Sequence, residues 1–98
     1  FSLISNQVHL KAMIHPDIIN LRKHDALHNT DYVPTLTAYF ANNRNALKAS
    51  TALHIHKSTF FYRIGKIQSI TGLDLENETL LFAYEFSFYL LTYLENSK

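Results

Sequence analysis

Six histidines are the residues most suited to chemistry in this chain of 98 residues. His24 and His28 stand four residues apart, a spacing that places both imidazoles on one helix face and could contribute to a metal site. His54 and His56 fall on an expected turn, where their side chains diverge, and no HExxH pattern or carboxylate-rich cluster supplies a third ligand. We therefore expect no metal and no cofactor, and keep a metal-responsive sensor as a third hypothesis.

Other catalytic groupings are missing from the sequence. The chain has no Cys, which excludes thiol catalysis, disulfides and every zinc site that uses Cys. It also lacks a nucleophile–base grouping, a Gly-rich phosphate loop and paired carboxylates on a shared face. We expect a protein that is not an enzyme, and the absence of Cys fits a reducing compartment, so we expect it to be cytoplasmic.

The charged residues are distributed unevenly, although the formal net charge is only +1. Residues 44–71 contain five basic residues and no Asp or Glu, whereas residues 72–98 contain five acids and one Lys. A stretch without acids is typical of contact with a polyanion, because carboxylates near phosphates weaken binding. On charge alone, a solvated basic face explains the stretch equally well.

The elements that position this stretch are predicted to be helices throughout. Length and composition, with 47% hydrophobic residues, fit one all-α domain, a small helical bundle of about five helices. Residues 1–14 are expected to be the end of an upstream connector or linker helix, and residues 15–98 the domain itself. The chain starts without Met, so we expect it to be part of a longer protein. It has no signal-peptide pattern and no run of about 18 apolar residues, so we expect no membrane contact.

Two helices are predicted before the basic stretch. The first begins at Pro16, whose fixed φ suits a first helical turn, and ends near His28. Thr30 or Asp31 is expected to cap the second helix. The buried stripe of this second helix is predicted to consist of Val33, Leu36 and Phe40.

The basic stretch itself opens with a short helix, predicted from residue 46 to about residue 53 with Asn45 as its N-cap. Its small side chains, Ser50 among them, allow a neighbouring helix to cross closely. His54 then occupies a turn position that needs positive φ, which His tolerates better than most residues with a side chain. The core anchors on either side of this turn are predicted to be Leu53 and Ile55.

A longer helix is predicted from about residue 57 to residue 71, ended by Gly72. Its core-facing residues are predicted to be Phe60, Ile64, Ile67 and Ile70, which leaves an outer face that is basic, polar and aromatic. Two short helices joined by a tight turn, the second of them basic, form a helix-turn-helix, here over about residues 45–71. The major groove of B-DNA, about 12 Å wide, admits such a helix.

A last helix is predicted over about residues 78–94 and is apolar on all sides. A helix of this kind needs cover on all sides, which one small domain seldom supplies. We expect either a homodimer interface or packing on an upstream region.

One set of residues indicates a more specific class of protein. It contains a Thr-Leu pair and an aromatic, an Asn that opens a helix, a Leu-His-hydrophobic-His turn, a Tyr-Arg pair and a Thr-Gly-Leu-Asp tail. These residues, with a few between them, are Thr35, Leu36, Tyr39, Asn45, Leu53 to His56, Lys57, Thr59, Tyr62, Arg63, Lys66, Ile67 and Thr71 to Asp74. Over about residues 15–91 the chain resembles the C-terminal helix-turn-helix domain of PucR/CdaR-type bacterial transcription regulators.

The resemblance implies a DNA-binding domain tethered to an upstream sensing domain of the same protein. The chain departs from the family pattern at Lys57-Ser58, where Arg-Asn is common, and at residues 42–44, where a Gly-rich approach is common. Lys57 can meet a phosphate but lacks the planar fork that binds guanine through two hydrogen bonds, so it is a weaker candidate for base contact.

The candidate DNA contacts lie on the two motif helices and their approach. They are Arg44, Asn45, Lys48, His56, Lys57, Ser58, Thr59, Phe61, Tyr62, Arg63 and Lys66. The N-terminal turn of the second helix favours anions, and basic residues around it add affinity with little sequence information. Arg63 is equally a candidate for an intramolecular pair with Glu76 or Glu78, and Tyr62 for a structural role. Phe61 could touch a thymine methyl or pack against the preceding turn.

The leading hypothesis is therefore a homodimeric DNA-binding domain of a bacterial transcription regulator that reads the major groove of double-stranded DNA with residues 57–71. The alternative is a helical dimerisation or protein-interaction module with weak or no DNA binding. The modest net charge and the apolar last helix favour this alternative.

Overall fold

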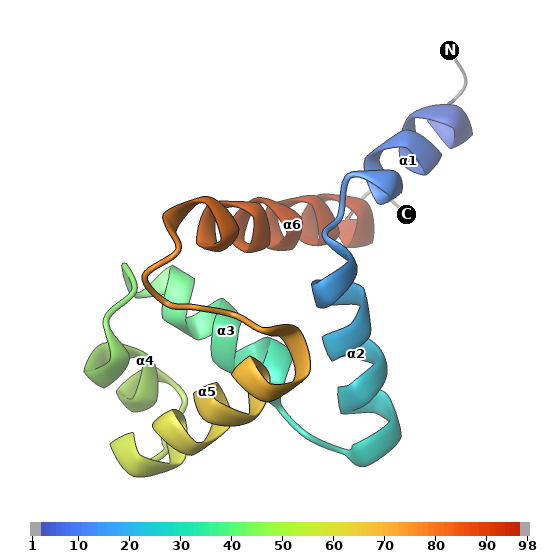
Figure 1. Ribbon diagram of the computed structural model, residues 1–98. Helices are drawn as coiled ribbons and strands as arrows, with labels where there is room; N and C mark the ends of the chain where they lie inside the picture. The colour runs from blue at the N-terminus through green and yellow to red at the C-terminus, as the bar shows by residue number, and fades with distance from the viewer. Residues whose placement is uncertain (1–2, 97–98) are drawn as a thin grey trace.

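A computed structural model describes residues 3–96, which form six α-helices and, within that range, no strand (Figure 1). The expected all-α bundle is confirmed, with one helix more than the five expected because residues 3–12 form a separate helix. The helices are α1 (Leu3–Ala12), α2 (Pro16–His28), α3 (Tyr32–Ala41), α4 (Ala46–Ala52), α5 (Lys57–Thr71) and α6 (Glu78–Asn96). None of the described helices is long and apolar enough to cross a membrane.

The core lies where α2, α3, α5 and α6 meet, and α3 runs between α5 and α6 (Figure 1). The largest apolar side chains that are less than 2% exposed are Tyr84, Phe60, Ile18, Leu21, Leu36, Ile67 and Leu81. Helix α1 contacts the C-terminal part of α6 (Figure 1). The assignment of residues 1–14 to a connector stays a prediction.

The buried stripe of α3 differs from the predicted one. Val33 and Phe40 are only half-buried, whereas Leu36 is fully buried as expected. The observed stripe repeats at i, i+3, i+4 and i+7, as one face of a helix requires, and consists of Tyr32, Thr35, Leu36 and Tyr39. Phe40 instead turns toward α6, where its ring lies 5.8 Å from that of Phe88.

Asp31 occupies the N-cap position of α3 as expected, but it does not cap the helix with its side chain. The Asp31 side chain makes no capping hydrogen bond, and the Thr30 hydroxyl donates to Asp25. The cap is Asp25 of α2, whose carboxylate accepts from the backbone N–H groups of Tyr32 at 3.0 Å and Val33 at 2.8 Å. This is possible because Asn29, with φ 55°, reverses the chain and brings the last turn of α2 beside the start of α3.

The core face of α5 also ends differently. Phe60, Ile64 and Ile67 are buried as predicted, but Ile70 is 39% exposed. The stripe continues through the half-buried Thr71, which lies four residues after Ile67 and therefore on the same face. Leu73, placed by the left-handed Gly72, fills the core at this end.

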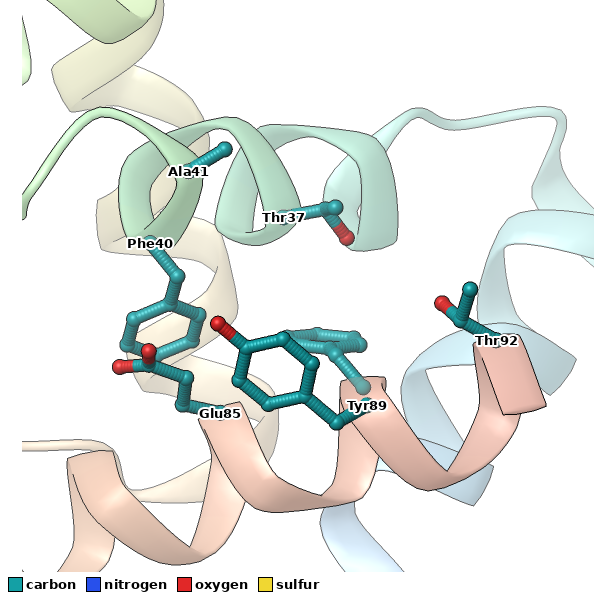
Figure 2. Close-up of a pocket in the computed structure, with 7 residues that line it drawn as sticks. Thr37, Phe40, Ala41, Glu85, Tyr89 and Thr92 are labelled. Carbon is teal, nitrogen blue, oxygen red and sulfur yellow. The ribbon is translucent and has the colours of Figure 1, made fainter.

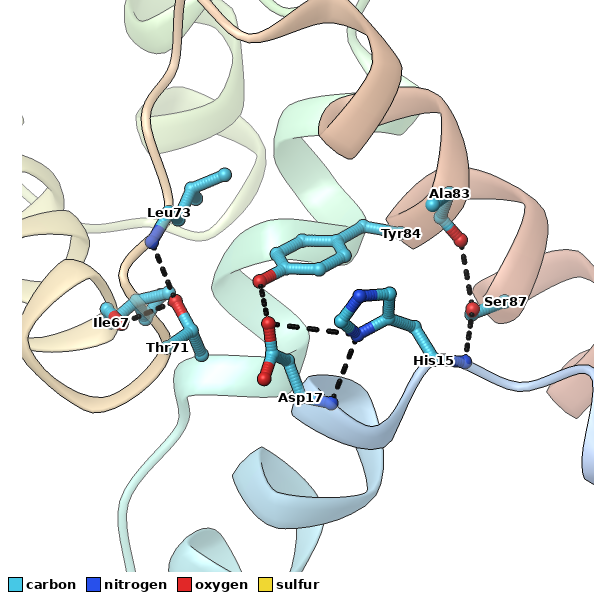
Figure 3. A network of polar contacts seen from close by, with 8 residues as sticks. All are labelled: His15, Asp17, Ile67, Thr71, Leu73, Ala83, Tyr84 and Ser87. Carbon is cyan, nitrogen blue, oxygen red and sulfur yellow. Dashed lines mark hydrogen bonds and ion pairs between the residues drawn. The ribbon is translucent and has the colours of Figure 1, made fainter.

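A buried polar network holds the start of α2 against the middle of α6 (Figure 3). The His15 backbone N–H donates to the Ser87 hydroxyl at 2.8 Å, and the Tyr84 hydroxyl donates to the Asp17 carboxylate. The Ser87 hydroxyl donates in turn to the Ala83 carbonyl, so these buried groups are satisfied. Burial of Tyr84 and its hydrogen bond to Asp17 raise the pKa of its phenol well above the ordinary value.

Candidate nucleic-acid interface

The turn between α4 and α5 has the geometry that the sequence predicts. His54 adopts φ 57°, and the Ile55 N–H donates to the Ser50 carbonyl at 3.0 Å, which closes the end of α4. Ser50 and Ala49 are buried, and α4 packs against both α3 and α5. Leu53 and Ile55 are half-buried and pack against the core, as expected of the turn anchors.

Two of the predicted DNA-contact residues cap these helices. The Asn45 side chain accepts from the Lys48 N–H at 2.9 Å at the start of α4. His56 Nδ1 accepts from the Ser58 N–H at 3.1 Å at the start of α5, and its ring also lies 2.9 Å from the Ser58 hydroxyl. Both capping side chains are exposed, so each fixes the start of its helix and can still be reached from outside the molecule.

The outer face of α5 carries exposed basic and aromatic side chains in two pairs. Lys57 Nζ lies 6.0 Å from the centre of the Phe61 ring, and Lys66 Nζ lies 5.5 Å from the centre of the Tyr62 ring. Phe61 is 46% exposed and Tyr62 is 63% exposed, so neither is part of the core. We call seven of the exposed residues on this helix the α5 outer face: Lys57, Ser58, Thr59, Phe61, Tyr62, Gly65 and Lys66.

The α5 outer face also keeps its lysine charges available. Lys57 and Lys66 form no ion pair with any described residue, and the same is true of Lys48, which is exposed on α4. An ammonium group without a carboxylate partner can bind a phosphate without first breaking an ion pair. Three such groups on two adjoining helices favour a polyanion as the partner.

The two arginines of the predicted set lie elsewhere. Arg44, with φ 60°, turns its half-buried guanidinium toward α6, where it pairs with Glu78 and lies 3.8 Å from Glu85. Arg63 is half-buried and donates to the Thr35 hydroxyl at 3.2 Å, and not to Glu76 or Glu78. The fold therefore brings the lysines together and draws both arginines toward neighbouring helices.

Sequence reasoning did not single out Leu47 and Thr51, which are exposed beside Lys48 on α4. Leu47 is 61% exposed, and an apolar residue in a helix of seven residues gives no signal that it points outward. Gly65 is exposed in the middle of α5, and a Cβ placed on it would meet nothing within 4 Å. Packing inside the molecule therefore gives no reason for a Gly at this position.

The histidines of the metal hypothesis make other contacts. The His24 ring lies 4.4 Å from that of His28 and stacks on Tyr32 at 5.2 Å, and it is 3.1 Å from the Thr30 hydroxyl. Across residues 3–96, no three His, Asp or Glu side chains come close enough to hold a metal ion.

Buried small residues at the crossing, a turn closed through positive φ and a second helix with an unpaired basic face define a helix-turn-helix domain of the DNA-binding class. Residues 32–96 match the family described as the PucR C-terminal helix-turn-helix domain. The chain belongs to this family, and it is a DNA-binding domain of the type found in transcription regulators.

Curated relatives agree with this assignment. Over 43 residues the chain is 49% identical to the carbohydrate diacid regulator of Escherichia coli (strain K12), a match covering 44% of the chain and 11% of that protein. It is 39% identical over 54 residues to the transcriptional activator PmfR of Paenarthrobacter nicotinovorans, covering 55% of the chain and 12% of PmfR.

A further relative is the proline-responsive transcriptional activator PutR of Bacillus subtilis (strain 168), 34% identical over 61 residues, covering 62% of the chain and 15% of PutR. The matches thus span only 11 to 15% of the length of these relatives. No solved structure matches the chain significantly.

Proposed function

We propose that α5 enters the major groove of double-stranded DNA, and that the chain is the C-terminal DNA-binding domain of a cytoplasmic bacterial transcription regulator with an upstream sensing domain. The observation that carries this proposal is the α5 outer face, where exposed lysines pair with aromatic rings and no carboxylate is present. Relatives described as regulators and transcriptional activators support it.

The side chains of the α5 outer face divide into two groups by chemistry. Lys57, Lys66 and the neighbouring Lys48 supply charge to phosphates, which gives affinity and register. Ser58, Thr59, Phe61 and Tyr62 supply hydroxyl groups and apolar edges, which suit base edges and thymine methyl groups. Asn45 and His56 cap the helix starts with their side chains and stay exposed there, so they can also meet a phosphate.

Arg44 and Arg63 have a different role in this proposal. Arg44 holds the loop before α4 against α6, and Arg63 holds α5 against α3. Each guanidinium therefore positions the motif, while the lysines contact the DNA.

Charge reversal on α5 tests the proposal. Lys57→Glu with Lys66→Glu should reduce affinity for duplex DNA about a hundredfold or more, measured by fluorescence anisotropy at low salt, because two phosphate contacts become repulsions. The matched control reverses two exposed lysines outside the motif, Lys11→Glu with Lys23→Glu, which changes the net charge equally. The proposal is wrong if both double variants bind DNA like the unaltered chain, or if both lose binding to the same extent.

We further propose that the chain works as a homodimer, since paired half-sites are the usual targets of such domains. The alternative function, a helical interaction module with weak or no DNA binding, is favoured by one observation: α6 keeps several large aromatic side chains exposed. That alternative predicts self-association that persists in the Lys57→Glu, Lys66→Glu variant and no salt-sensitive DNA binding by the unaltered chain.

A further inference from the structure

Helix α6 presents a row of aromatic side chains that the domain does not cover. Phe82, Phe86 and Tyr89 are 66%, 39% and 68% exposed and stand at i, i+4 and i+7. The Phe82 and Phe86 rings stack with their centres 6.2 Å apart. This spacing keeps all three on one side of the helix. We call these three residues the α6 aromatic face.

The acidic residues of α6 each lie near an arginine of the same chain. Glu78 and Glu85 lie against Arg44, and Glu95 lies 3.4 Å from Arg22. Arg44 offers one positive charge to two carboxylates, so Glu78 and Glu85 are not both neutralised, but neither of them belongs to the α6 aromatic face. The chemistry of the α6 aromatic face favours an uncharged, aromatic partner surface.

A hollow beside the α6 aromatic face offers space for a ring. It has a volume of about 120 Å³, lies between α3 and α6, and is lined by Thr37, Phe40, Ala41, Phe88, Tyr89, Thr92 and the carboxylate-bearing Glu85 (Figure 2). A cavity of roughly 150 Å³ can hold a benzene ring, so the hollow is of the right order for one aromatic side chain. The α6 aromatic face and the hollow are therefore adjacent, and Tyr89 belongs to both.

We propose that a second copy of this chain covers the α6 aromatic face, with aromatic side chains of each copy seated at the hollow between α3 and α6 of the other. A two-fold contact requires a surface complementary to itself, and an uncharged row beside a ring-sized hollow satisfies this. This inference identifies the surface of the homodimer proposed above and does not depend on DNA binding.

The expected size of the contact fits a reversible dimer. An aromatic side chain buries 150–250 Å² when fully covered, so the exposed parts of the three side chains on two copies amount to roughly 500–900 Å². Stable interfaces bury about 1,200–2,000 Å², so residues around the rows must also take part. We expect a dimer that dissociates in the micromolar range.

Helix α3 lies between α5 and α6 (Figure 1), so the proposed dimer surface and the α5 outer face can be altered separately. Sedimentation velocity of the 98-residue chain over a range of concentrations tests the inference. Phe82→Gln with Tyr89→Gln should weaken dimerisation about a hundredfold or more, because four rings leave the interface. Both side chains are mostly exposed, so thermal unfolding of the variant should stay close to that of the unaltered chain.

The matched control is Leu27→Gln, which removes a 79% exposed apolar side chain from α2 and should leave dimerisation unchanged. A chain that stays monomeric up to millimolar concentration would show that a second copy does not cover this face, and would overturn the inference. A dimer that survives Phe82→Gln with Tyr89→Gln would place the contact elsewhere and overturn the inference. Loss of dimerisation would not decide the DNA-binding proposal, which the anisotropy measurements on the lysine variants test separately.

Discussion

Gly65→Ala is expected to change stability and DNA affinity in opposite directions. Gly65 is the ninth of 15 residues in α5, and its backbone is helical. A Cβ added there meets nothing within 4 Å, so the folded chain accepts it without strain. If α5 lies in the major groove, however, the same methyl group points toward DNA, where a close approach of the backbone leaves no room for it.

The two magnitudes follow from different interactions. Replacing Gly by Ala inside a helix should raise the free energy of unfolding by about 1 kcal/mol. For a domain of this size that corresponds to a rise in Tm of about 4–8 °C. Forcing a methyl group into a closely packed contact costs roughly 1–3 kcal/mol, which lowers DNA affinity by about tenfold or more.

The assay pairs thermal unfolding with fluorescence anisotropy on one preparation of protein. Asn20→Ala is the control, since Asn20 is exposed in the middle of α2 and should also gain helix stability while leaving DNA binding unchanged. A more stable Gly65→Ala variant with unchanged DNA affinity would refute the reasoning, because the backbone of α5 would then not approach DNA at this position. A less stable variant would refute the structural premise that space is open here.

Three further predictions concern stability, alkaline pH and salt. Asp25→Ala should lower the free energy of unfolding by about 2–3 kcal/mol in urea titration, whereas Asp31→Ala, which removes no cap, should cost less than about 0.5 kcal/mol. The raised pKa of Tyr84 means that burial of its neutral phenol contributes stability below its ordinary pKa of 10.0, and this is lost as pH rises toward the folded-state pKa. The unaltered chain should therefore lose stability above pH 10.0 more steeply than Tyr84→Phe does, and equal slopes in alkaline unfolding would contradict this. In DNA titrations at several salt concentrations, Lys48→Gln should reduce the slope of log affinity against log salt by about 0.9, while Arg63→Gln should leave it unchanged.

The sequence predicted the helix-turn-helix well, because interactions between residues close in sequence determine its geometry. The bounds of α5, the Asn45 cap and the positive φ of His54 each depend on residues within one turn of the chain, and the structure has all three as expected. The cap of α3 could not be found in the same way, because Asp25 reaches it only after the chain has reversed at Asn29.

The same limit applies to the candidate site. The exposure of Phe61 and Tyr62 follows from helical periodicity, since the core stripe fixes which face points outward. The partners of Arg44 and Arg63 lie on α6 and α3, from 28 to 41 positions away in sequence, and only packing brings them together. Whether an arginine meets DNA or its own domain is therefore decided by tertiary structure, which charge counting along the chain does not register.

The attachment of His15 to Ser87 has a mechanical consequence. Helix α1 ends at Ala12, and only a short link separates it from the residue whose backbone is bound to the middle of α6. A displacement of α1 is therefore passed to α6 through the hydrogen bond between His15 and Ser87, and to α5 through α2, which contacts α5 directly. A movement of α1 would thus act on α6 and α5 together, because one short connection leads to both contacts.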